Sequence, residues 1–245
     1  MSVPVQTVGL FGAGGRMGER LRAALPAHPH LALGVCIDRD TPADVDFSGV
    51  DVVVDFSLPE ATDALLRRLG GRATPLVSGV TGRSAVQRAR LDAYAGRAPV
   101  LVASNFSLGV ALLRRLVAQA AGAVDWDVEV LELHHRRKVD APSGTALTLA
   151  EAAALGRGLH WPDAARSPRT AGARVVEEIG VSALRGGDVV GEHTVFLLGE
   201  GERLELTHRA TDRTVFAHGA LKAAGWLVGR SPGHHTLDDV LGLSR

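Results

Sequence analysis

The chain reads Val8-Gly9-Leu10-Phe11-Gly12-Ala13-Gly14-Gly15-Arg16-Met17-Gly18 near its N-terminus. An apolar run typical of a strand leads into a glycine cluster, and the residues that follow have helical spacing. Glycines at such a junction permit a tight turn and let the backbone approach a pyrophosphate, whose charge meets the free amides of the helix start. The spacing is G-x-x-G-x-x-G, because Met17 takes the sixth place of the stricter G-x-G-x-x-G pattern. The motif indicates a phosphate-binding loop, with a plain glycine-rich turn as the alternative.

The next apolar run supports nucleotide binding. It ends at Asp38 and Arg39, and Asp38 lies 20 residues after Gly18, close to the place of a ribose-binding acid. A carboxylate accepts the ribose hydroxyls of NAD, whereas a neighbouring guanidinium can pair with the extra phosphate of NADP. The two residues together predict the use of both NADH and NADPH. A surface Asp-Arg pair at a strand end is the alternative.

The first part of the chain alternates short apolar runs with longer helical segments, which is typical of a parallel α/β sheet. The expected strands are Gln6–Phe11, Leu31–Ile37, Asp51–Asp55, Pro75–Ser78 and Val100–Ala103, and the expected helices are Arg16–Leu25, Pro59–Leu69 and Ser84–Gly96. In such a sheet, ligands bind beyond the carboxyl ends of the strands. We therefore expect the binding residues in the loops that follow these strands.

The pattern changes after Asn105, where strands gather without regular alternation with helices. We expect helices over Leu108–Gly122, Gly144–Leu155 and Thr214–Val228, a strand over Trp126–Leu133, and a strand-rich stretch over Arg174–Ala210 that includes Glu192–Leu198 and Arg203–Thr207. Such an order favours a separate α+β domain. The predicted fold class is α/β: a Rossmann-like parallel-sheet nucleotide-binding domain over residues 1–106, completed by 214–245, and a smaller α+β substrate and oligomerisation domain over 107–213.

Composition excludes several classes of protein. The 245 residues are 46% hydrophobic and include 27 basic and 27 acidic residues, so the chain is too apolar for disorder and lacks the basic field that drives binding to nucleic acid. The single cysteine excludes a disulfide framework and favours a reducing compartment, which we expect to be the cytoplasm. We expect no signal peptide and no membrane span, because Met1–Gly15 has no basic start and Ser107–Val124 carries two arginines.

The most informative segment is Glu132-Leu133-His134-His135-Arg136-Arg137-Lys138-Val139-Asp140-Ala141-Pro142-Ser143-Gly144-Thr145-Ala146-Leu147. Basic side chains end a strand, and a Pro-Ser-Gly-Thr turn opens a helix. The start of that helix offers free amide donors and the hydroxyls of Ser143 and Thr145, which together suit a carboxylate. The adjacent His134, His135 and Lys138 can hold an anion and deliver a proton.

Simpler explanations of this segment remain open. A basic run is often a solvated strip or one that faces nucleic acid, and paired histidines can cap a strand. Adjacent strand histidines point to opposite faces, and no H-E-x-x-H string is present, so we expect no metal. Only Lys138 and Lys222 are lysines among the 27 basic residues. Lysine, unlike arginine, can give up a proton, which favours a proton donor at Lys138.

Taken together, these residues resemble the dihydrodipicolinate reductase family, nicotinamide-dependent enzymes of the diaminopimelate route to lysine. The resemblance covers essentially the whole chain. It is carried by the glycine loop, Val54-Asp55-Phe56-Ser57-Leu58-Pro59, Gly79-Val80-Thr81-Gly82, Ala103-Ser104-Asn105-Phe106-Ser107-Leu108-Gly109, the segment from Glu132 to Leu147, Gly191-Glu192-His193-Thr194 and Phe216-Ala217-His218-Gly219-Ala220-Leu221. The segment with the histidine pair is highly specific to the family, whereas the glycine loop alone is not.

The resemblance implies a role for each matching residue. Cofactor-binding residues would be Gly12, Ala13, Gly14, Gly15, Arg16 and Met17 at the pyrophosphate, Asp38 at the adenosine ribose, Arg39 at the NADP phosphate, and Gly79, Val80, Thr81, Ala103, Ser104, Asn105 and Phe106 at the nicotinamide half. His134 would donate or accept a proton and Lys138 would donate one. His135, Gly144 and Thr145 would hold the substrate's carboxylates. Many members have threonine at the position of Val80 and alanine at that of Ser104, so one hydroxyl contact with the cofactor is in doubt.

The implied activity is the NADH- or NADPH-dependent reduction of 4-hydroxy-tetrahydrodipicolinate, through dihydrodipicolinate, to tetrahydrodipicolinate. The family also implies a homotetramer, and the apolar alternation of Arg174–Ala210 predicts pairing with other subunits. Two alternatives stay open: a related amino-acid dehydrogenase with the same nucleotide fold, and a dinucleotide sensor without catalysis.

Overall fold

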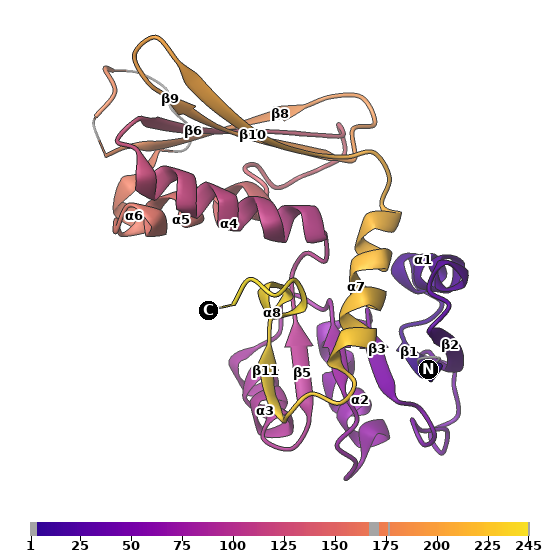
Figure 1. Ribbon diagram of the computed structural model, residues 1–245. Coiled ribbons are helices and arrows are strands. Elements are labelled where there is room, and N and C mark those ends of the chain that lie inside the picture. Colours follow the sequence, from indigo (N-terminus) through magenta and orange to yellow (C-terminus); the bar gives the residue numbers. More distant parts are fainter. Residues whose placement is uncertain (1–3, 167–171, 176, 245) are drawn as a thin grey trace. The chain divides into compact units, whose positions relative to one another are not determined.

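The computed structural model describes residues 4–166, 172–175 and 177–244. The chain forms two compact units, each with its own sheet and core (Figure 1). Unit 1 consists of Met1–Leu108 and Thr214–Arg245, and unit 2 consists of Gly109–Arg213. Within the described ranges, no helix is long and apolar enough to cross a membrane.

Unit 1 is built on a parallel sheet whose described strands run in the order β11-β5-β4-β3-β1-β2. These strands are β1 (Gln6–Phe11), β2 (Leu31–Ile37), β3 (Val52–Asp55), β4 (Leu76–Ser78), β5 (Pro99–Val102) and β11 (Gly233–His235). The chain runs outward from β1 to β2 and then returns to β3 on the other side of β1. The direction of winding therefore reverses between β1 and β3, which is where α/β sheets bind their ligands.

Helices cover both faces of this sheet. They are α1 (Arg16–Ala24), α2 (Thr62–Leu69), α3 (Ala85–Ala95), α7 (Thr214–Leu227) and α8 (Leu237–Val240), with the 3-10 turns η1 (Leu25–Ala27) and η2 (Pro59–Ala61). Leu65 of α2 and Leu91 of α3 share a core cluster with Val53 of β3. Helix α7 packs on β3, β4 and β5, with α1 beside it. Val52 and Val54, which alternate with Val53, are also fully buried, as expected for a strand covered on both faces.

Unit 2 contains a mixed sheet with the described strand order β10-β9-β6-β8-β7. Its strands are β6 (Asp127–His134), β7 (Ala165–Arg166), β8 (Ile179–Arg185), β9 (Gly191–Leu198) and β10 (Arg203–Ala210). Strand β6 pairs in parallel with β8 and antiparallel with β9. Helices α4 (Leu108–Ala123), α5 (Gly144–Gly156) and α6 (Trp161–Ala164) lie on one face of this sheet (Figure 1).

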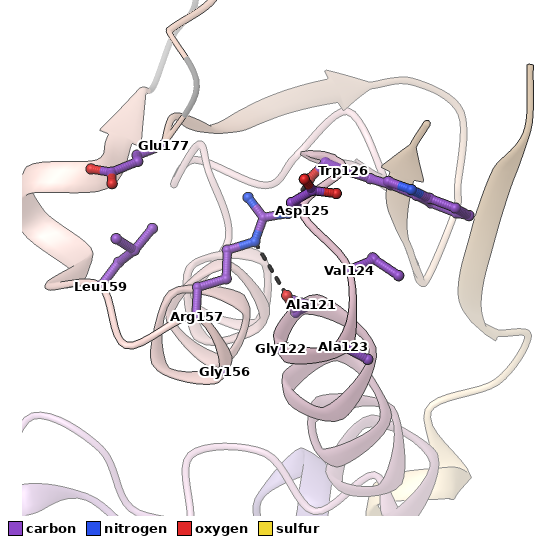
Figure 2. A pocket seen from close by; sticks show the side chains of 10 residues that line it. All are labelled: Ala121, Gly122, Ala123, Val124, Asp125, Trp126, Gly156, Arg157, Leu159 and Glu177. Atoms are coloured by element: carbon purple, nitrogen blue, oxygen red, sulfur yellow. Dashed lines mark hydrogen bonds between the residues drawn. The ribbon is translucent and has the colours of Figure 1, made fainter. Parts of the chain in front are cut away.

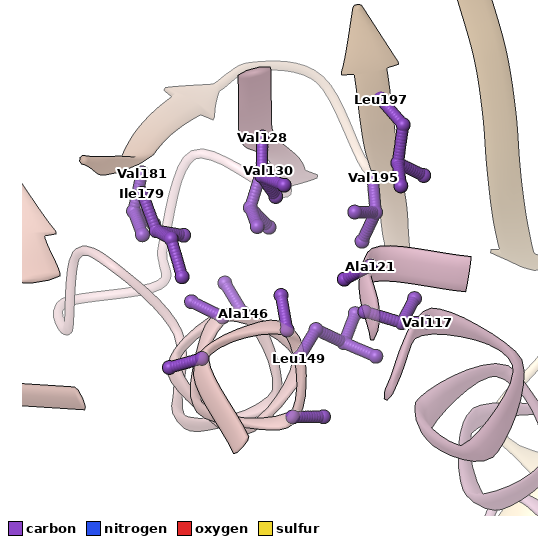
Figure 3. Packing of buried hydrophobic residues seen from close by; sticks show 14 of the residues in the cluster. Val117, Ala121, Val128, Val130, Ala146, Leu149, Ile179, Val181, Val195 and Leu197 are labelled. Atoms are coloured by element: carbon purple, nitrogen blue, oxygen red, sulfur yellow. The ribbon is translucent and has the colours of Figure 1, made fainter. Parts of the chain in front are cut away.

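The core of unit 2 lies between this sheet and its helices. Figure 3 shows Val117 of α4 and Leu149 of α5 directed at Val130 of β6 and Val195 of β9. Buried and half-buried residues alternate along β6, because successive side chains of a strand point to opposite faces. The opposite face is more open: Leu184 of β8 is 51% exposed and Leu198 of β9 is 36% exposed.

The predicted fold class, a Rossmann-like parallel sheet with a smaller α+β part, is confirmed. Differences lie mainly at element ends. The helix predicted to start at Pro59 begins as the 3-10 turn η2, and α2 starts at Thr62. The strand-rich stretch predicted from Arg174 starts as a strand only at Ile179, and residue 176 lies outside the described residues. Beyond the expected helix Thr214–Val228, the chain forms β11, which extends the unit 1 sheet beside β5.

Candidate active site

The glycine loop joins β1 to α1 in a conformation that requires glycine. Gly12 has φ +80°, and a Cβ there would lie 2.9 Å from the backbone of Phe56. A Cβ on Gly18 would collide with the carbonyl oxygen of Ala13. Gly15 is the N-cap of α1, and no described side chain caps this helix start. The amides of Gly14 and Gly15 already donate to Asp38 and to the Gly12 carbonyl, so the donors for a pyrophosphate are those of the uncapped first turn of α1. With the room that the glycines leave, the residues present fit a dinucleotide.

Asp38 lies against this loop at the end of β2. Its carboxylate accepts hydrogen bonds from the backbone amide of Gly14 and, at 2.8 Å, from that of Arg39. The hydroxyl of Thr41 accepts from the Asp38 amide at 2.8 Å. The two neighbouring amides hold the carboxylate beside the loop, where a ribose would lie in a dinucleotide fold. Arg39 itself is exposed.

The residues predicted at the nicotinamide half follow the neighbouring strands β4 and β5. The Gly79 amide donates to the Asp55 carbonyl at 2.8 Å, and the Ala103 amide donates to the Ser78 carbonyl at 3.1 Å. Phe106 is 2% exposed, and its ring centroid lies 5.5 Å from that of Phe56. The full set after these strands is Gly79, Val80, Thr81, Ala103, Ser104, Asn105 and Phe106. Because parallel strands end at one edge of a sheet, these loops and the glycine loop share that edge.

A buried ion pair that the sequence did not reveal lies beneath these loops. Asp55 is fully buried at the end of β3, and its carboxylate accepts from Arg83 Nη2 at 2.7 Å. Arg83, whose side chain is 4% exposed, also donates to the Val80 carbonyl at 3.2 Å. Further partners in the cluster are Ser57, Ser78 and Thr62. Burial lowers the pKa of Arg83, while Asp55 opposes that shift. Every charged group in this cluster thus has a charged or hydroxyl partner.

In unit 2, the helix-covered face of the sheet changes from apolar to polar toward the end of β6. Glu132 lies beside His193 of β9, which in turn lies beside His208 of β10. His134, two residues after Glu132 on the same face, lies beside Arg185 of β8. This polar end gathers a carboxylate, a guanidinium and imidazoles in a part of the sheet that is largely buried.

Glu132 is the centre of this cluster. It is fully buried, and one carboxylate oxygen lies 2.5 Å from His134 Nδ1 while the other accepts from the Ser143 amide at 2.9 Å. Arg185 donates to both oxygens at 2.7 Å. Burial alone would raise the pKa of Glu132, but the hydrogen bonds from Arg185, His134 and Ser143 outweigh it and the pKa is lowered. The carboxylate is therefore ionised near neutral pH.

His193 adds a second imidazole to the cluster. It is 4% exposed, its Nε2 lies 3.1 Å from the Ser143 hydroxyl oxygen, and its ring centroid lies 5.1 Å from that of His134. Burial, followed by the charge of His134, lowers the pKa of His193 to about 4. His193 is therefore neutral at physiological pH and serves as a hydrogen-bond partner for the helix start.

The loop from His135 to Ser143 brings the other predicted residues to the same end of the sheet. Lys138 Nζ lies 2.8 Å from both carboxylate oxygens of Asp140, and this contact lowers the pKa of Asp140. Arg213 Nη2 lies 3.0 Å from His135 Nε2. Partial burial and then Arg213 lower the pKa of His135, so its ring is neutral and accepts the Arg213 proton at Nε2.

Helix α5 starts beside this loop. Ser143 is its N-cap, with an extended backbone and a hydroxyl that accepts from the Ala146 amide at 3.1 Å. Gly144 and Thr145 form the first turn, and a Cβ added at Gly144 would meet no described atom within 4 Å. An open helix start beside cationic groups suits an anion such as a carboxylate.

Glu132, Arg185, His193 and Arg83 were not predicted as site residues. A signal for Glu132 exists, because residues two apart on a strand share a face and His134 follows it at that spacing. Arg185 and His193 come from other strands, so only strand pairing reveals them. Among the described residues, no group of three or more histidine, cysteine, aspartate or glutamate side chains is placed to hold a metal ion.

A cavity of about 610 Å³ in unit 2 lies apart from this cluster, at the C-terminal ends of α4 and α5 (Figure 2). It is lined by Ala121, Gly122, Ala123, Val124, Asp125, Trp126, Gly156, Arg157, Leu159 and Glu177. Arg157 Nε donates to the Ala121 carbonyl at 3.3 Å. This hydrogen bond gives a partner to one of the last carbonyls of α4. The residues around this cavity include none of the predicted site residues.

Comparison with known proteins matches both units. The family described as dihydrodipicolinate reductase, N-terminus, matches residues 6–106, and its C-terminus counterpart matches residues 109–241. A 4-hydroxy-tetrahydrodipicolinate reductase from a Nitratiruptor species is 47% identical, over 96% of this chain and 99% of its own length. The reductase of the same name from Caulobacter vibrioides is 42% identical over 100% of both chains.

A solved structure has a similar fold. The dipicolinate-bound dihydrodipicolinate reductase from Paenisporosarcina sp. TG-14 aligns with a TM-score of 0.75 at 22% identity, over 95% of this chain and 97% of that chain. Together, the two matches to the family models cover the strands of both sheets. The chain therefore belongs to the dihydrodipicolinate reductase family.

Proposed function

We propose that this chain catalyses the NADH- or NADPH-dependent reduction of 4-hydroxy-tetrahydrodipicolinate, through dihydrodipicolinate, to tetrahydrodipicolinate. Its relatives carry the name of this activity and align over nearly the whole chain. The observation that carries the proposal is the ionised Glu132 against His134, beside Lys138 and the open start of α5. This set can bind a dianionic ring and give it a proton.

We assign the cofactor to unit 1. The amides at the start of α1, with Gly12, Ala13, Gly14, Gly15, Arg16 and Met17, would hold the pyrophosphate. Asp38 would accept the ribose hydroxyls, and the exposed Arg39 would pair with the additional phosphate of NADPH. When bound, the nicotinamide supplies a hydride. Use of both cofactors follows from having the acid and the guanidinium side by side.

The loops after β4 and β5 would line the nicotinamide half. Both loops are short. The buried Arg83 donates a hydrogen bond to the Val80 carbonyl in the first of them. Val80 brings no hydroxyl, so contacts at that position would come from backbone groups. Backbone carbonyls and amides are strong hydrogen-bonding groups and could orient the carboxamide there.

We assign the cyclic dicarboxylate to unit 2. The first turn of α5, with Ser143, Gly144 and Thr145, would bind a carboxylate through amides and hydroxyls, and His135 would donate to it. After loss of the 4-hydroxyl group as water, the conjugated double bond would take up a hydride at one carbon and a proton at its neighbour. The ring carbon that receives the proton must face a donor.

Lys138 and His134 are the proposed proton donors. Lys138 Nζ lies 2.8 Å from the carboxylate of Asp140. A carboxylate of the substrate can take the place of Asp140 in this contact. His134 directs Nδ1 at Glu132, so its Nε2 is the atom that can donate a proton to the substrate ring. A general acid placed in this way is typically worth about a hundredfold to ten-thousandfold in rate.

We further propose that the chain acts as a homotetramer in the cytoplasm. The face of the unit 2 sheet opposite its helices carries apolar side chains, of which Leu184 is 51% exposed. Exposed apolar side chains that group on one surface are typical of an interaction site between proteins. Sedimentation equilibrium of the purified chain would test the tetramer.

The function is tested by following cofactor oxidation with freshly formed 4-hydroxy-tetrahydrodipicolinate. We expect turnover with NADH and with NADPH, and none with oxaloacetate plus ammonia. Turnover only with the second pair would indicate an amino-acid dehydrogenase. Binding of NADH without turnover of either substrate would indicate a sensor.

A further inference from the structure

We propose that Glu132 is a positioning residue that orients His134 and holds the first turn of α5 with a single carboxylate. This inference rests on the function proposed above. It concerns how one buried group couples the proton donor to the carboxylate-binding helix start. Glu132 is fully buried, so it acts through its neighbours rather than on the substrate.

The orientation of His134 is the first effect of this carboxylate. An ionised carboxylate only accepts hydrogen bonds, so the 2.5 Å contact requires a proton on Nδ1 of His134. The Nε2 atom is then the position at which a proton can be exchanged. A Cβ at residue 191 would lie 2.9 Å from that Nε2. Because residue 191 is glycine, no side chain at this position blocks the Nε2 atom.

The start of α5 is held by the other oxygen of Glu132. That oxygen accepts from the Ser143 amide at 2.9 Å, and Ser143 caps the helix through its hydroxyl. His193 Nε2 lies 3.1 Å from the same hydroxyl. A change at Glu132 would therefore release both the imidazole and the turn that contains Gly144.

Arg185 makes it possible to bury this carboxylate. It donates to both oxygens at 2.7 Å and to the Asp140 carbonyl at 2.5 Å, so it also ties down the loop that carries Lys138. A buried carboxylate without a partner would be strongly destabilising, whereas a bidentate guanidinium offsets the loss of water. Arg185 thus compensates the buried charge, and the contact with His134 remains available for positioning.

The first experiment is Glu132→Gln in the full chain, with kcat and KM measured for both substrates. The amide keeps the size of the side chain but also offers a donor to Nδ1, so it no longer selects one form of the ring. We expect kcat to fall at least about tenfold, while KM for NADH stays unchanged because the cofactor is assigned to unit 1. Glu129→Gln is the matched control, since Glu129 is also on β6 but pairs with Arg174 and points to the opposite face from His134. Its kcat should equal that of the unaltered chain.

A second variant separates positioning from folding. Glu132→Gln alone leaves Arg185 without its counter-charge and can unfold the protein. The double variant Glu132→Gln with Arg185→Gln removes both charges, so we expect it to fold better while kcat remains low. If the folded double variant turns over at the rate of the unaltered chain, Glu132 is structural only and the proposal is wrong.

Histidine nitrogen spectra give a readout independent of turnover. In the unaltered chain, two-bond proton–nitrogen correlations should show His134 protonated at Nδ1, and the Glu132→Gln variant should show a mixture of forms. Protonation only at Nε2 in the neutral ring of the unaltered chain would overturn the proposal. If the unaltered chain shows the expected form but reduces no hydroxy-tetrahydrodipicolinate, the proposed function fails and the positioning geometry stands.

Discussion

Each unit of this chain places a buried carboxylate, paired with an arginine, at the end of its sheet. In unit 1 the pair is Asp55 and Arg83, and the other partners are hydroxyls, a backbone amide and a backbone carbonyl. In unit 2 the pair is Glu132 and Arg185, and a third partner is His134. Both carboxylates are fully buried, and the pairs differ in one side-chain neighbour, the imidazole of His134. We interpret the first as a fixed support for cofactor loops and the second as a support for proton transfer.

Removal of Lys138, the proposed proton donor, should have the largest effect on turnover. Lys138→Ala should lower kcat by about a hundredfold to ten-thousandfold, with KM for NADH unchanged, because the lysine belongs to unit 2. The measurement is steady-state kinetics with both substrates varied. Lys222→Ala is the control, since Lys222 is an exposed lysine of α7 and should leave kcat unaltered. Equal turnover in the Lys138 variant would remove it from the mechanism.

The fixed character of the unit 1 pair is tested by Arg83→Met. This change leaves Asp55 buried without a charged partner and should lower the free energy of unfolding by about 3–5 kcal/mol. Urea titration of the full chain measures it. Arg72→Met is the control, because its pair with Asp46 is solvent-exposed, with side chains 44% and 36% accessible, and should cost at most about 1 kcal/mol. A loss below about 1 kcal/mol for Arg83→Met would contradict this interpretation.

The titratable character of the unit 2 cluster predicts a pH dependence of stability. His193 has a pKa of about 4 in the folded chain, below the ordinary value of about 6.5, so the unfolded chain binds the proton more readily between these values. Stability should therefore decrease as pH falls from about 6.5 toward 4, by up to about 3 kcal/mol from this group. The charged and titratable groups that act on it are Glu132, His134, His208 and Lys138.

The variant His193→Gln isolates this contribution. Glutamine does not titrate, so the free energy of unfolding should fall less between pH 7 and pH 5 than in the unaltered chain. Urea titrations at the two pH values give the difference. Equal pH dependence in both proteins would show that His193 is not held neutral by the fold.

The smallest expected effect concerns the choice of cofactor. Arg39→Ala should raise KM for NADPH by roughly fivefold, equivalent to about 1 kcal/mol for an exposed ion pair, and leave KM for NADH unchanged. Kinetics with each cofactor measure the ratio. A parallel rise for both cofactors would place Arg39 away from the additional phosphate.

The sequence predicted features that depend on local order. The glycine loop, the strands Gln6–Phe11 and Leu31–Ile37, and the helix start at Gly144 appear in the structure at the predicted places. Glycine requirements, hydrophobic periodicity and capping act over a few residues, so a single sequence contains them. His134 and Lys138 could be proposed as site residues for the same reason, because they lie in one continuous segment of the sequence.

Features that depend on strand pairing could not be predicted from the sequence. Arg185 lies 53 residues from Glu132 in sequence and His193 lies 50 residues from Ser143, and only the register of β6 with β8 and β9 brings them together. The three-residue strand β11 is too short for a periodic signal and is stabilised by its neighbour β5. Nothing in the sequence distinguishes the buried Arg83 from the many exposed arginines of the chain.

The most direct test is a crystal structure of the chain with NADH and dipicolinate, an aromatic dicarboxylate analogue of the proposed substrate. We predict a ligand carboxylate at the first turn of α5, on Gly144 and Thr145, with Lys138 moved from Asp140 to the ligand and the ring facing His134 Nε2. A dicarboxylate bound elsewhere, with Lys138 still paired to Asp140, would contradict the proposed site.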